Sequence, residues 1–296
     1  MKKVLFATTA LVATAGVAAA DVTFGGLGRF GVLYVDNAAT ETTLESRFRL
    51  VVTATAESDN GLSFGAQIRY QSNEHRSSYT GGGAGFNTPR FWVSTQGFTV
   101  SVGQVLGAIE NMPGMYTGSV GLTGLGYANV VYNFAADAYT SGGAGAQGLD
   151  VLWSSGNWGV HFSYSWTGQG NTQTDDRVAA HVSYSMGNWN FALGGQDSNI
   201  AGDTSWAATV GGTWGNFDGT LQYADNDGNA KWGIAGNYQA GASTFVRGYI
   251  NTDDAINDEN YGLGFQHRMG GGTFLEGGIA SLAGNTRADL GLRFSF

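Results

Sequence analysis

The sequence has 296 residues but no cysteine, only 2 prolines and few charged side chains, 12% of the total. Without cysteine there is no disulfide framework and no thiolate chemistry. Positive charge is also scarce, because 14 Lys and Arg residues face 23 Asp and Glu residues, a net charge of -9. A net acidic chain with scattered arginines is a poor candidate for binding nucleic acid phosphates.

Beyond the first twenty residues, no apolar run is long enough for a transmembrane helix, which needs about 20 residues. The first twenty residues have the pattern of a secretory signal peptide. Lys2 and Lys3 precede an apolar run, and a small-residue cleavage site follows at positions 18–20. We expect residues 1–20 to be removed and residues 21–296 to form one domain. The alternative, an N-terminal membrane anchor, requires a longer apolar stretch.

In contrast to these scarce residue types, glycine and aromatic residues are abundant in the chain. The 49 glycines are about 17% of the chain, against a usual ~7%. They follow no G-X-Y period and accompany 13% aromatic residues, which excludes collagen and ordinary disorder. The mean hydropathy of -0.11 resembles that of a soluble protein, but a membrane barrel with one face in lipid also averages near neutral.

Apolar and polar residues alternate along most of the chain after residue 20, as the two faces of a strand require. In one segment Trp158, Phe162 and Trp166 share a face, while His161 and Ser163 lie on the other. Such segments are about ten residues long, close to the ~9–11 residues of a tilted transmembrane strand and longer than the ~5–6 of an average soluble strand. Pro89 and Pro113 fall outside the alternating segments.

The turns repeat as well. A Gly-Asn pair followed by an aromatic residue begins at Gly156, Gly187 and Gly215, and Gly supplies the positive φ of a tight hairpin. We expect these aromatic residues at the membrane–water interface. A glycine-, methionine- and tyrosine-rich segment of about forty residues, placed at about 108–148, interrupts the rhythm and is long enough to be functional. The remaining hairpins predict sixteen antiparallel strands, a size at which a barrel encloses an aqueous channel.

At this point the sequence resembles an outer-membrane general diffusion porin of the alphaproteobacterial, or purple-bacterial, type. The residues that carry the resemblance span the chain after residue 20. They are Asp21-Val22-Thr23-Phe24-Gly25-Gly26-Leu27-Gly28-Arg29-Phe30-Gly31, Ser46-Arg47-Phe48-Arg49-Leu50, Gly61-Leu62-Ser63-Phe64-Gly65-Ala66, Thr99-Val100-Ser101-Val102-Gly103 and Ala288-Asp289-Leu290-Gly291-Leu292-Arg293-Phe294-Ser295-Phe296.

The resemblance implies a sixteen-stranded transmembrane β-barrel in the outer membrane of a Gram-negative bacterium. It implies a water-filled channel for ions and small hydrophilic solutes, with the long loop folded into the pore and no cofactor. It also implies a homotrimer in contact with outer-membrane lipid and lipopolysaccharide. The resemblance also implies that the barrel-assembly machinery recognises the terminal Phe296.

Side chains alternate between the two faces of a strand, and we call this alternation strand parity. It places five arginines on the polar face of neighbouring strands: Arg29, Arg47, Arg49, Arg69 and Arg293, with Arg90 as a further candidate. We expect this face to line the pore, because an arginine on the lipid face at the midplane costs about 2–4 kcal/mol. The alternative is that these arginines only pair with carboxylates such as Glu45, Glu57, Glu276 and Asp289 and stiffen the wall. Like-charged walls in a narrow channel set ion preference.

In the resembled family the pore loop carries acidic residues opposite the arginines. Here the predicted loop holds only Glu110 and Asp137, and Met112, Met115 and Tyr116 indicate a more apolar lip. We therefore expect a pore less selective for cations than the family norm, with anion preference as the limiting case.

His161 and His181 flank a predicted loop symmetrically and are expected to be neighbours in the lumen. With no third ligand evident, a polar lining is favoured over a metal pair. Calcium could bind to oxygen-rich segments at Asp225 and Asp227 or at Asp253 and Asp254. A plain solvated turn is the favoured interpretation of the first segment, which lacks the glutamate that ends an EF-hand loop.

Three other functions stay open. A barrel enzyme would need an assembled Ser–His–acid or metal site, which the four scattered histidines do not offer. A secreted soluble β-protein, such as an adhesin or lectin, would not need detergent for extraction. A solute-specific porin would show saturable uptake of one solute.

Overall fold

The structure is a computed structural model and describes residues 21–73, 82–117, 120–125, 131, 147–166, 176–199, 204–254 and 258–296. The predicted signal peptide, residues 1–20, lies outside the described residues and its cleavage stays a prediction. In the described part of the chain, no helix is long and apolar enough to cross a membrane.

Alternating sequence produces strands throughout the described residues. They are β1 (Asp21–Val35), β2 (Thr42–Glu57), β3 (Ser63–Asn73), β4 (Gly82–Phe86), β5 (Arg90–Thr95), β6 (Phe98–Gly103), β7 (Gln147–Ser155), β8 (Trp158–Trp166), β9 (Asp176–Met186), β10 (Trp189–Ser198), β11 (Ser205–Trp214), β12 (Phe217–Asn226), β13 (Asn229–Gln239), β14 (Thr244–Asp253), β15 (Asp258–Gly270), β16 (Thr273–Leu282) and β17 (Asn285–Ser295).

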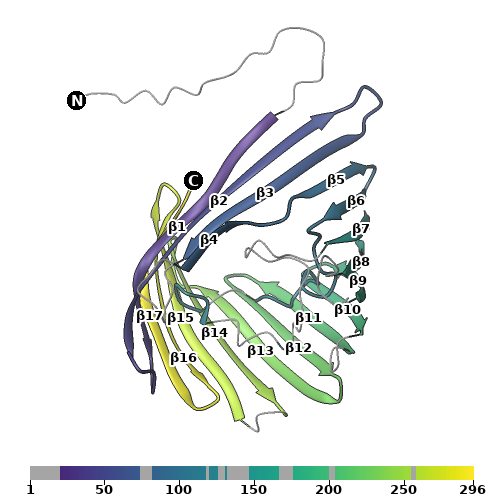
Figure 1. The fold of residues 1–296 in the computed structure, drawn as a ribbon. Coiled ribbons are helices and arrows are strands. Elements are labelled where there is room, and N and C mark those ends of the chain that lie inside the picture. Colours follow the sequence, from purple (N-terminus) through teal and green to yellow (C-terminus); the bar gives the residue numbers. More distant parts are fainter. Residues whose placement is uncertain are drawn as a thin grey trace, which may run out of the picture.

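These strands form one closed antiparallel sheet, in which each strand except β4 and β5 pairs with its neighbours in sequence and β17 returns to β1 (Figure 1). Both β4 and β5 pair with β3 and follow one another along it, so they occupy one position in the wall. Pro89 lies in the break between them, as expected for a residue that cannot donate to a ladder. The wall therefore has sixteen strand positions, the number of strands predicted from the hairpins.

The first and last strands close the barrel. Register pairs run from Leu27 opposite Ser295 to Val35 opposite Arg287. Beyond the strand pairing, Gly26 and Phe296 exchange two backbone hydrogen bonds of 2.9 and 3.2 Å. The ring of Phe296 stacks on that of Phe48 with centroids 5.8 Å apart. Closure leaves no open sheet edge, which is the condition for a sheet within hydrocarbon.

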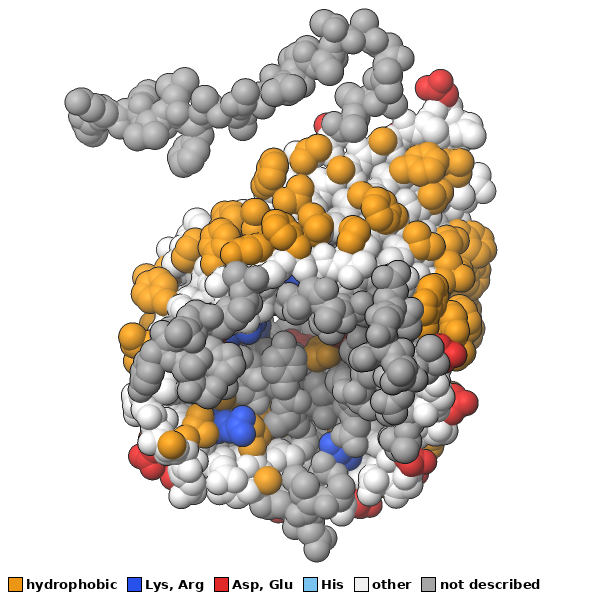
Figure 2. Space-filling view, viewed as in Figure 1, with side chains coloured by type: hydrophobic (Ala, Val, Ile, Leu, Met, Phe, Trp, Pro, Cys, Tyr) orange, Lys and Arg blue, Asp and Glu red, His pale blue; other side chains and the backbone are white. Residues whose placement is uncertain are grey.

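The two faces of the wall differ as parity predicted. On β8, Trp158 is 51% exposed and Phe162 is 39% exposed, whereas His161 is 1% exposed. The apolar face therefore points outward and the polar face points to the lumen. Figure 2 shows hydrophobic side chains spread over the outer wall, with Lys and Arg side chains within the outline of the barrel.

Both ends of the described chain, Asp21 and Phe296, lie at one rim of the barrel, which we call the terminal rim. The three predicted Gly-Asn turns are at this rim, and Gly156, Gly187 and Gly215 have φ values of 57°, 58° and 59°. Exposed aromatic residues follow the rim in contact with one another. Ring centroids are 4.5 Å apart for Trp158 and Tyr184, 4.8 Å for Trp189 and Trp214, and 6.2 Å for Trp214 and Phe217.

The opposite rim, which we call the loop rim, also has tight turns. β12 and β13 are joined by the two-residue turn at Asp227 and Gly228, where φ is 54° and 84°. β16 and β17 are joined in the same way at Ala283 and Gly284, with φ of 48° and 74°. At these two places, two residues with positive φ suffice to reverse the chain.

Adjacent residues on β12 test the assignment of the two faces. Leu221 is 52% exposed on the outer wall, and Thr220 faces the lumen. Leu221→Arg should destabilise the barrel in lipid vesicles by about 2–4 kcal/mol, because the charge enters hydrocarbon. Thr220→Arg is the matched control and should change the free energy of unfolding much less. Denaturant unfolding in vesicles measures both, and equal losses would contradict the assignment.

Candidate functional site

The chain enters the lumen directly after β6. Gly103, the last residue of β6, has a φ of 98°, and a Cβ there would lie 2.2 Å from the carbonyl oxygen of Pro89. Only glycine fits this turn. The strand therefore ends a few residues before the predicted loop start, and Gln104 and Val105 are already buried.

Three side chains from consecutive strands fix the start of the pore loop to the inner wall. Asp150 on β7 accepts a 3.1 Å hydrogen bond from the backbone N–H of Leu106. Ser163 on β8 accepts one of 2.9 Å from the N–H of Ala108. The Nδ1 of His181 on β9 lies 2.6 Å from the carbonyl oxygen of Ala108. The first part of the loop therefore lies along the inner wall and does not project freely into the lumen.

The next part of the loop packs on a stripe of alanines. Met112 and Met115 are 2% and 0% exposed and belong to a buried apolar cluster whose wall side is made by Ala179, Ala192, Ala207 and Ala224 of β9–β12. Small wall residues leave room that flexible methionines fill. The prediction that both methionines form the lip was therefore wrong, whereas Tyr116 is 45% exposed.

Backbone carbonyls of the same part are held by polar side chains farther round the wall. Thr209 on β11 donates to the carbonyl of Pro113 at 2.6 Å, and Gln222 on β12 donates to that of Met115 at 2.8 Å. Asn237 on β13 donates to the carbonyl of Thr117 at 3.2 Å. The alternation that puts polar residues inside therefore supplies donors to the loop from β11, β12 and β13.

A second described part, residues 120–125, lies across the seam of the barrel, and we call it the seam strap. Asp289 on β17 accepts hydrogen bonds from the N–H of Leu122 at 2.9 Å and from the N–H and hydroxyl of Thr123 at 2.6 and 2.7 Å. The carbonyl of Leu122 accepts a 3.1 Å bond from Arg29. Glycine makes this approach possible, since a Cβ at Gly291 would lie 2.5 Å from a methyl carbon of Leu122.

All five predicted arginines lie on the inner face of neighbouring strands, as parity predicted. Arg29 on β1 is directly opposite Arg293 on β17 and Arg47 on β2. Arg49 is opposite Gln71 of β3, and Arg69 of β3 is opposite Val51. The further candidate Arg90 opens β5, and its guanidinium donates to Ser101 at 3.0 Å.

The arginines differ in what they contact. Arg29 is only 8% exposed and forms an ion pair with Glu45, beside its bond to the seam strap. Arg293 forms an ion pair with Glu276 at 2.7 Å. For these two, the alternative of pairing with carboxylates is correct, and Arg29 holds the loop in place. Asp289, another carboxylate named in that alternative, accepts hydrogen bonds from the loop backbone.

Arg47 and Arg49 form a different arrangement, which two amide side chains orient. The Nε of Arg47 donates to Asn73 at 2.5 Å, and the Nε of Arg49 donates to Gln71 at 2.6 Å. The amide of Gln71 also donates to Asn73 at 3.1 Å, which ties the two arginines together. An amide oxygen carries no net charge, so these bonds orient the guanidinium groups without cancelling their charge.

Sequence reasoning missed two further arginines of the inner wall, Arg247 on β14 and Arg268 on β15. On β14 the alternation is less clear, because the aromatic residues Phe245 and Tyr249 lie on the inner face with Arg247. Register reveals them, since Arg268 lies opposite Phe274, which in turn lies opposite Arg293.

The predicted acidic side of the pore is only partly within the described residues. Glu110 lies in the first part of the loop and is partly buried between residues that contact β8–β10. Asp137 lies outside the described residues. Their roles in the channel stay predictions.

His161 and His181 are cross-strand partners, with ring centroids 5.5 Å apart, as predicted from their symmetric spacing. The Nε2 of His161 lies 3.7 Å from Asp150. Across the described ranges, no three His, Cys, Asp or Glu side chains form a group that could hold a metal. The pair belongs to the structure beneath the first part of the loop.

At the first segment considered for calcium, both aspartates take part in the turn between β12 and β13. Asp225 accepts a 2.8 Å hydrogen bond from the N–H of Gly228 and so stabilises the two-residue turn. Asp227 occupies the turn itself. The side chain of Asp253 is outside the described part, and Asp254 is exposed. Calcium binding stays untested.

Three comparisons with known proteins agree with this architecture. Residues 7–287 match a family model described as Gram-negative porin. A porin of Fuscovulum blasticum is 30% identical over 299 residues, covering 93% of this chain and 100% of the relative. A porin of Rhodobacter capsulatus is 27% identical over 320 residues, with the same coverage of 93% and 100%.

Solved structures are similar over the same extent. A mutant of Rh. blastica porin superposes with a TM-score of 0.82 at 26% identity, covering 93% of this chain and 100% of the other. Another, described as showing asymmetric conductivity of engineered proteins, has a TM-score of 0.79 at 27% identity and the same coverage of 93% and 100%.

The seam strap yields a direct test. Asp289→Asn replaces a double acceptor by a group with one acceptor oxygen, so at least one hydrogen bond to residues 122–123 is lost. Losing a buried bond costs about 1–3 kcal/mol, which corresponds to about 5- to 150-fold faster amide hydrogen exchange at Leu122 and Thr123. Amides of the β1–β17 ladder should keep their exchange rates. Unchanged exchange at both loop amides would contradict the role of Asp289.

Proposed function

This chain belongs to the Gram-negative porin family, and from that premise we propose that ions and small hydrophilic solutes diffuse passively through its lumen. It is an outer-membrane channel protein and not an enzyme. The resemblance to purple-bacterial porins is confirmed by the relatives. Their names give no support to a solute-specific porin.

One observation carries the proposal of passive diffusion. A closed wall of sixteen positions places its apolar face outside and its polar face inside, with the pore loop held along the inner wall. A barrel of this size encloses an aqueous channel, and diffusion through water needs no chemistry from the protein.

The charge of the inner wall supports a preference for anions. Guanidinium groups stay charged at any working pH. Arg47 and Arg49 are oriented by amides, and Arg69 stands on the neighbouring strand. A wall of one sign attracts counter-ions into a narrow channel. We propose that this sector selects against cations and that the pore loop narrows the passage opposite it.

Reversal potentials in planar bilayers under a salt gradient test the preference. The native protein should favour chloride over potassium. Arg47→Gln combined with Arg49→Gln should shift the reversal potential toward that of a cation-selective pore, because two fixed charges leave the wall. Lys231→Gln, a control on β13, should shift it less. Strong cation selectivity of the native protein would refute the proposal.

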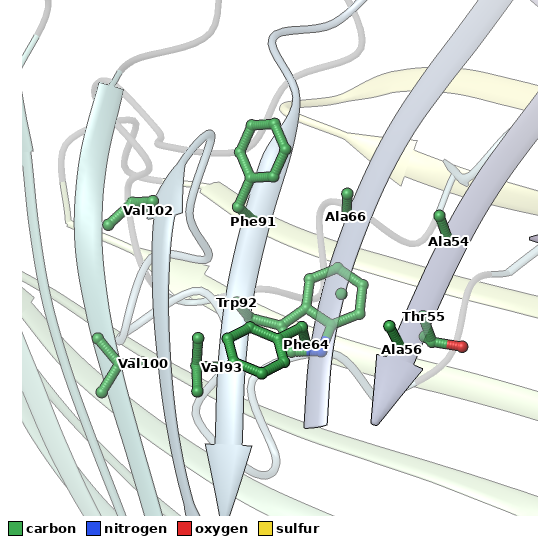
Figure 3. Close-up of a pocket in the computed structure, with 11 residues that line it drawn as sticks. Ala54, Thr55, Ala56, Phe64, Ala66, Phe91, Trp92, Val93, Val100 and Val102 are labelled. Atoms are coloured by element: carbon green, nitrogen blue, oxygen red, sulfur yellow. The ribbon is translucent and has the colours of Figure 1, made fainter. Parts of the chain in front are cut away.

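We also propose that three copies assemble into a homotrimer. An apolar groove of about 550 Å³ runs along the outer wall of β2, β3, β5 and β6, near the terminal rim. Figure 3 shows Phe64, Phe91 and Val93 with Val100 and Val102 around it, beside the small side chains of Ala54 and Ala66. A concave apolar surface suits close packing of a second protein wall better than a flat one.

The oligomeric state provides the test. Molar mass by light scattering in mild detergent should be three times that of one chain. Ala54→Trp should fill the groove and lower the temperature at which trimers dissociate, whereas Leu221→Trp, on the far side of the barrel, should not. A monomeric native protein would contradict the proposal.

Recognition of Phe296 by the barrel-assembly machinery, contact with lipopolysaccharide and calcium in the outer turns stay proposals that rest on the resemblance and the sequence alone.

A further inference from the structure

A second group of arginines lies between the seam strap and the terminal rim, on β14–β17. We call it the terminal-rim cluster and define it as Phe245, Arg247, Gln266, Arg268, Phe274, Glu276 and Arg293. Cross-strand pairing brings its members together. Gln266 is opposite both Phe245 and Glu276, and Phe274 is opposite both Arg268 and Arg293. The seam strap packs on the same strands one step farther from the rim, at Tyr249 and Gly264.

A chain of polar contacts orients two of the three arginines. Arg293 makes a two-pronged ion pair with Glu276, with contacts of 2.7 and 3.0 Å. Gln266 donates to the same carboxylate. The oxygen of Gln266 accepts a 3.3 Å bond from Arg247. Glu276 therefore fixes Arg293 directly and Arg247 through Gln266.

Arg268 is held differently. Its guanidinium lies 4.6 Å from the centre of the Phe245 ring, and that of Arg293 lies 4.5 Å from the centre of the Phe274 ring. Stacking covers the faces of a guanidinium and leaves its N–H edges to bind. Arg268 is exposed, and among the described residues it forms no ion pair.

The charges of this region do not cancel. Three guanidinium groups face the carboxylate of Glu276 and that of Asp218 on β12, which accepts a 2.6 Å hydrogen bond from Asn237. Among these five side chains, positive charges outnumber negative charges by one. Planar N–H edges match the oxygens of a phosphate or carboxylate and do not match a single-atom ion such as chloride.

We propose that the terminal-rim cluster is a binding site for a small, multiply charged oxyanion of the phosphate type, with Arg268 and Arg247 as its direct donors. It adjoins the sector of Arg47 and Arg49, because Arg293 lies opposite Arg29, which in turn lies opposite Arg47. The site would hold such an ion briefly on its way through the channel, and would do so more readily from the terminal rim than from the loop rim. This inference rests on the channel proposed above.

Chloride current through single channels, with inorganic phosphate added to one side of the bilayer at a time, tests the site. Phosphate on the terminal-rim side should lower the chloride current, and phosphate on the loop-rim side should need a higher concentration for the same effect. Arg268→Gln should raise the half-blocking concentration about 10-fold, the loss expected for a charge-assisted contact. Arg268→Lys should restore part of the effect, and Lys231→Gln, at the loop rim, should leave the block unchanged.

Each outcome separates the two proposals. If the native protein conducts chloride but phosphate has no effect from either side, the site is refuted and the channel stands. If Arg268→Gln conducts normally and is blocked as strongly as the native protein, the assignment to this cluster is refuted. If the native protein does not conduct at all, the proposed channel is refuted, and the site that rests on it is refuted as well.

Discussion

The need to satisfy every backbone N–H and C=O inside hydrocarbon determines this structure. A sheet can meet it only by closing on itself, and here closure is made between β1 and β17, with Gly26 and Phe296 extending the ladder at the rim. Once the wall is closed, parity decides the rest. One face must be apolar because it meets lipid, and the other can be polar because it meets water and the loop.

The lumen follows from the same alternation. A polar inner face provides hydrogen-bonding side chains, and the pore loop contacts them on many strands, from Asp150 on β7 to Asp289 on β17. Where the loop needs apolar contact, the wall offers alanine and glycine, which are small enough for a backbone or a methionine to approach. The loop is thus held inside the barrel without a core of its own, and Arg29 is one of the side chains that anchor it.

Much of the fold could be predicted from the sequence, because strands in a membrane barrel obey a strict period of two. The sixteen positions, the direction of Phe162 and His161 and the Gly-Asn turns all depend on that local rule. The destination of the loop could not be predicted, since Met112 and Met115 meet alanines that are 64 to 112 residues away only after closure. For the same reason, the pairing of Arg29 with Glu45 and the cluster around Arg268 depend on register rather than on local pattern.

The central claim is that the apolar face meets lipid while the polar face encloses water. The natural lack of cysteine permits single cysteines at Thr220 and Leu221, adjacent residues on opposite faces of β12. A charged, membrane-impermeant thiol reagent applied during single-channel recording should reduce the current of Thr220→Cys and leave that of Leu221→Cys unchanged. Modification that reduces the current at Leu221→Cys and not at Thr220→Cys would contradict the account.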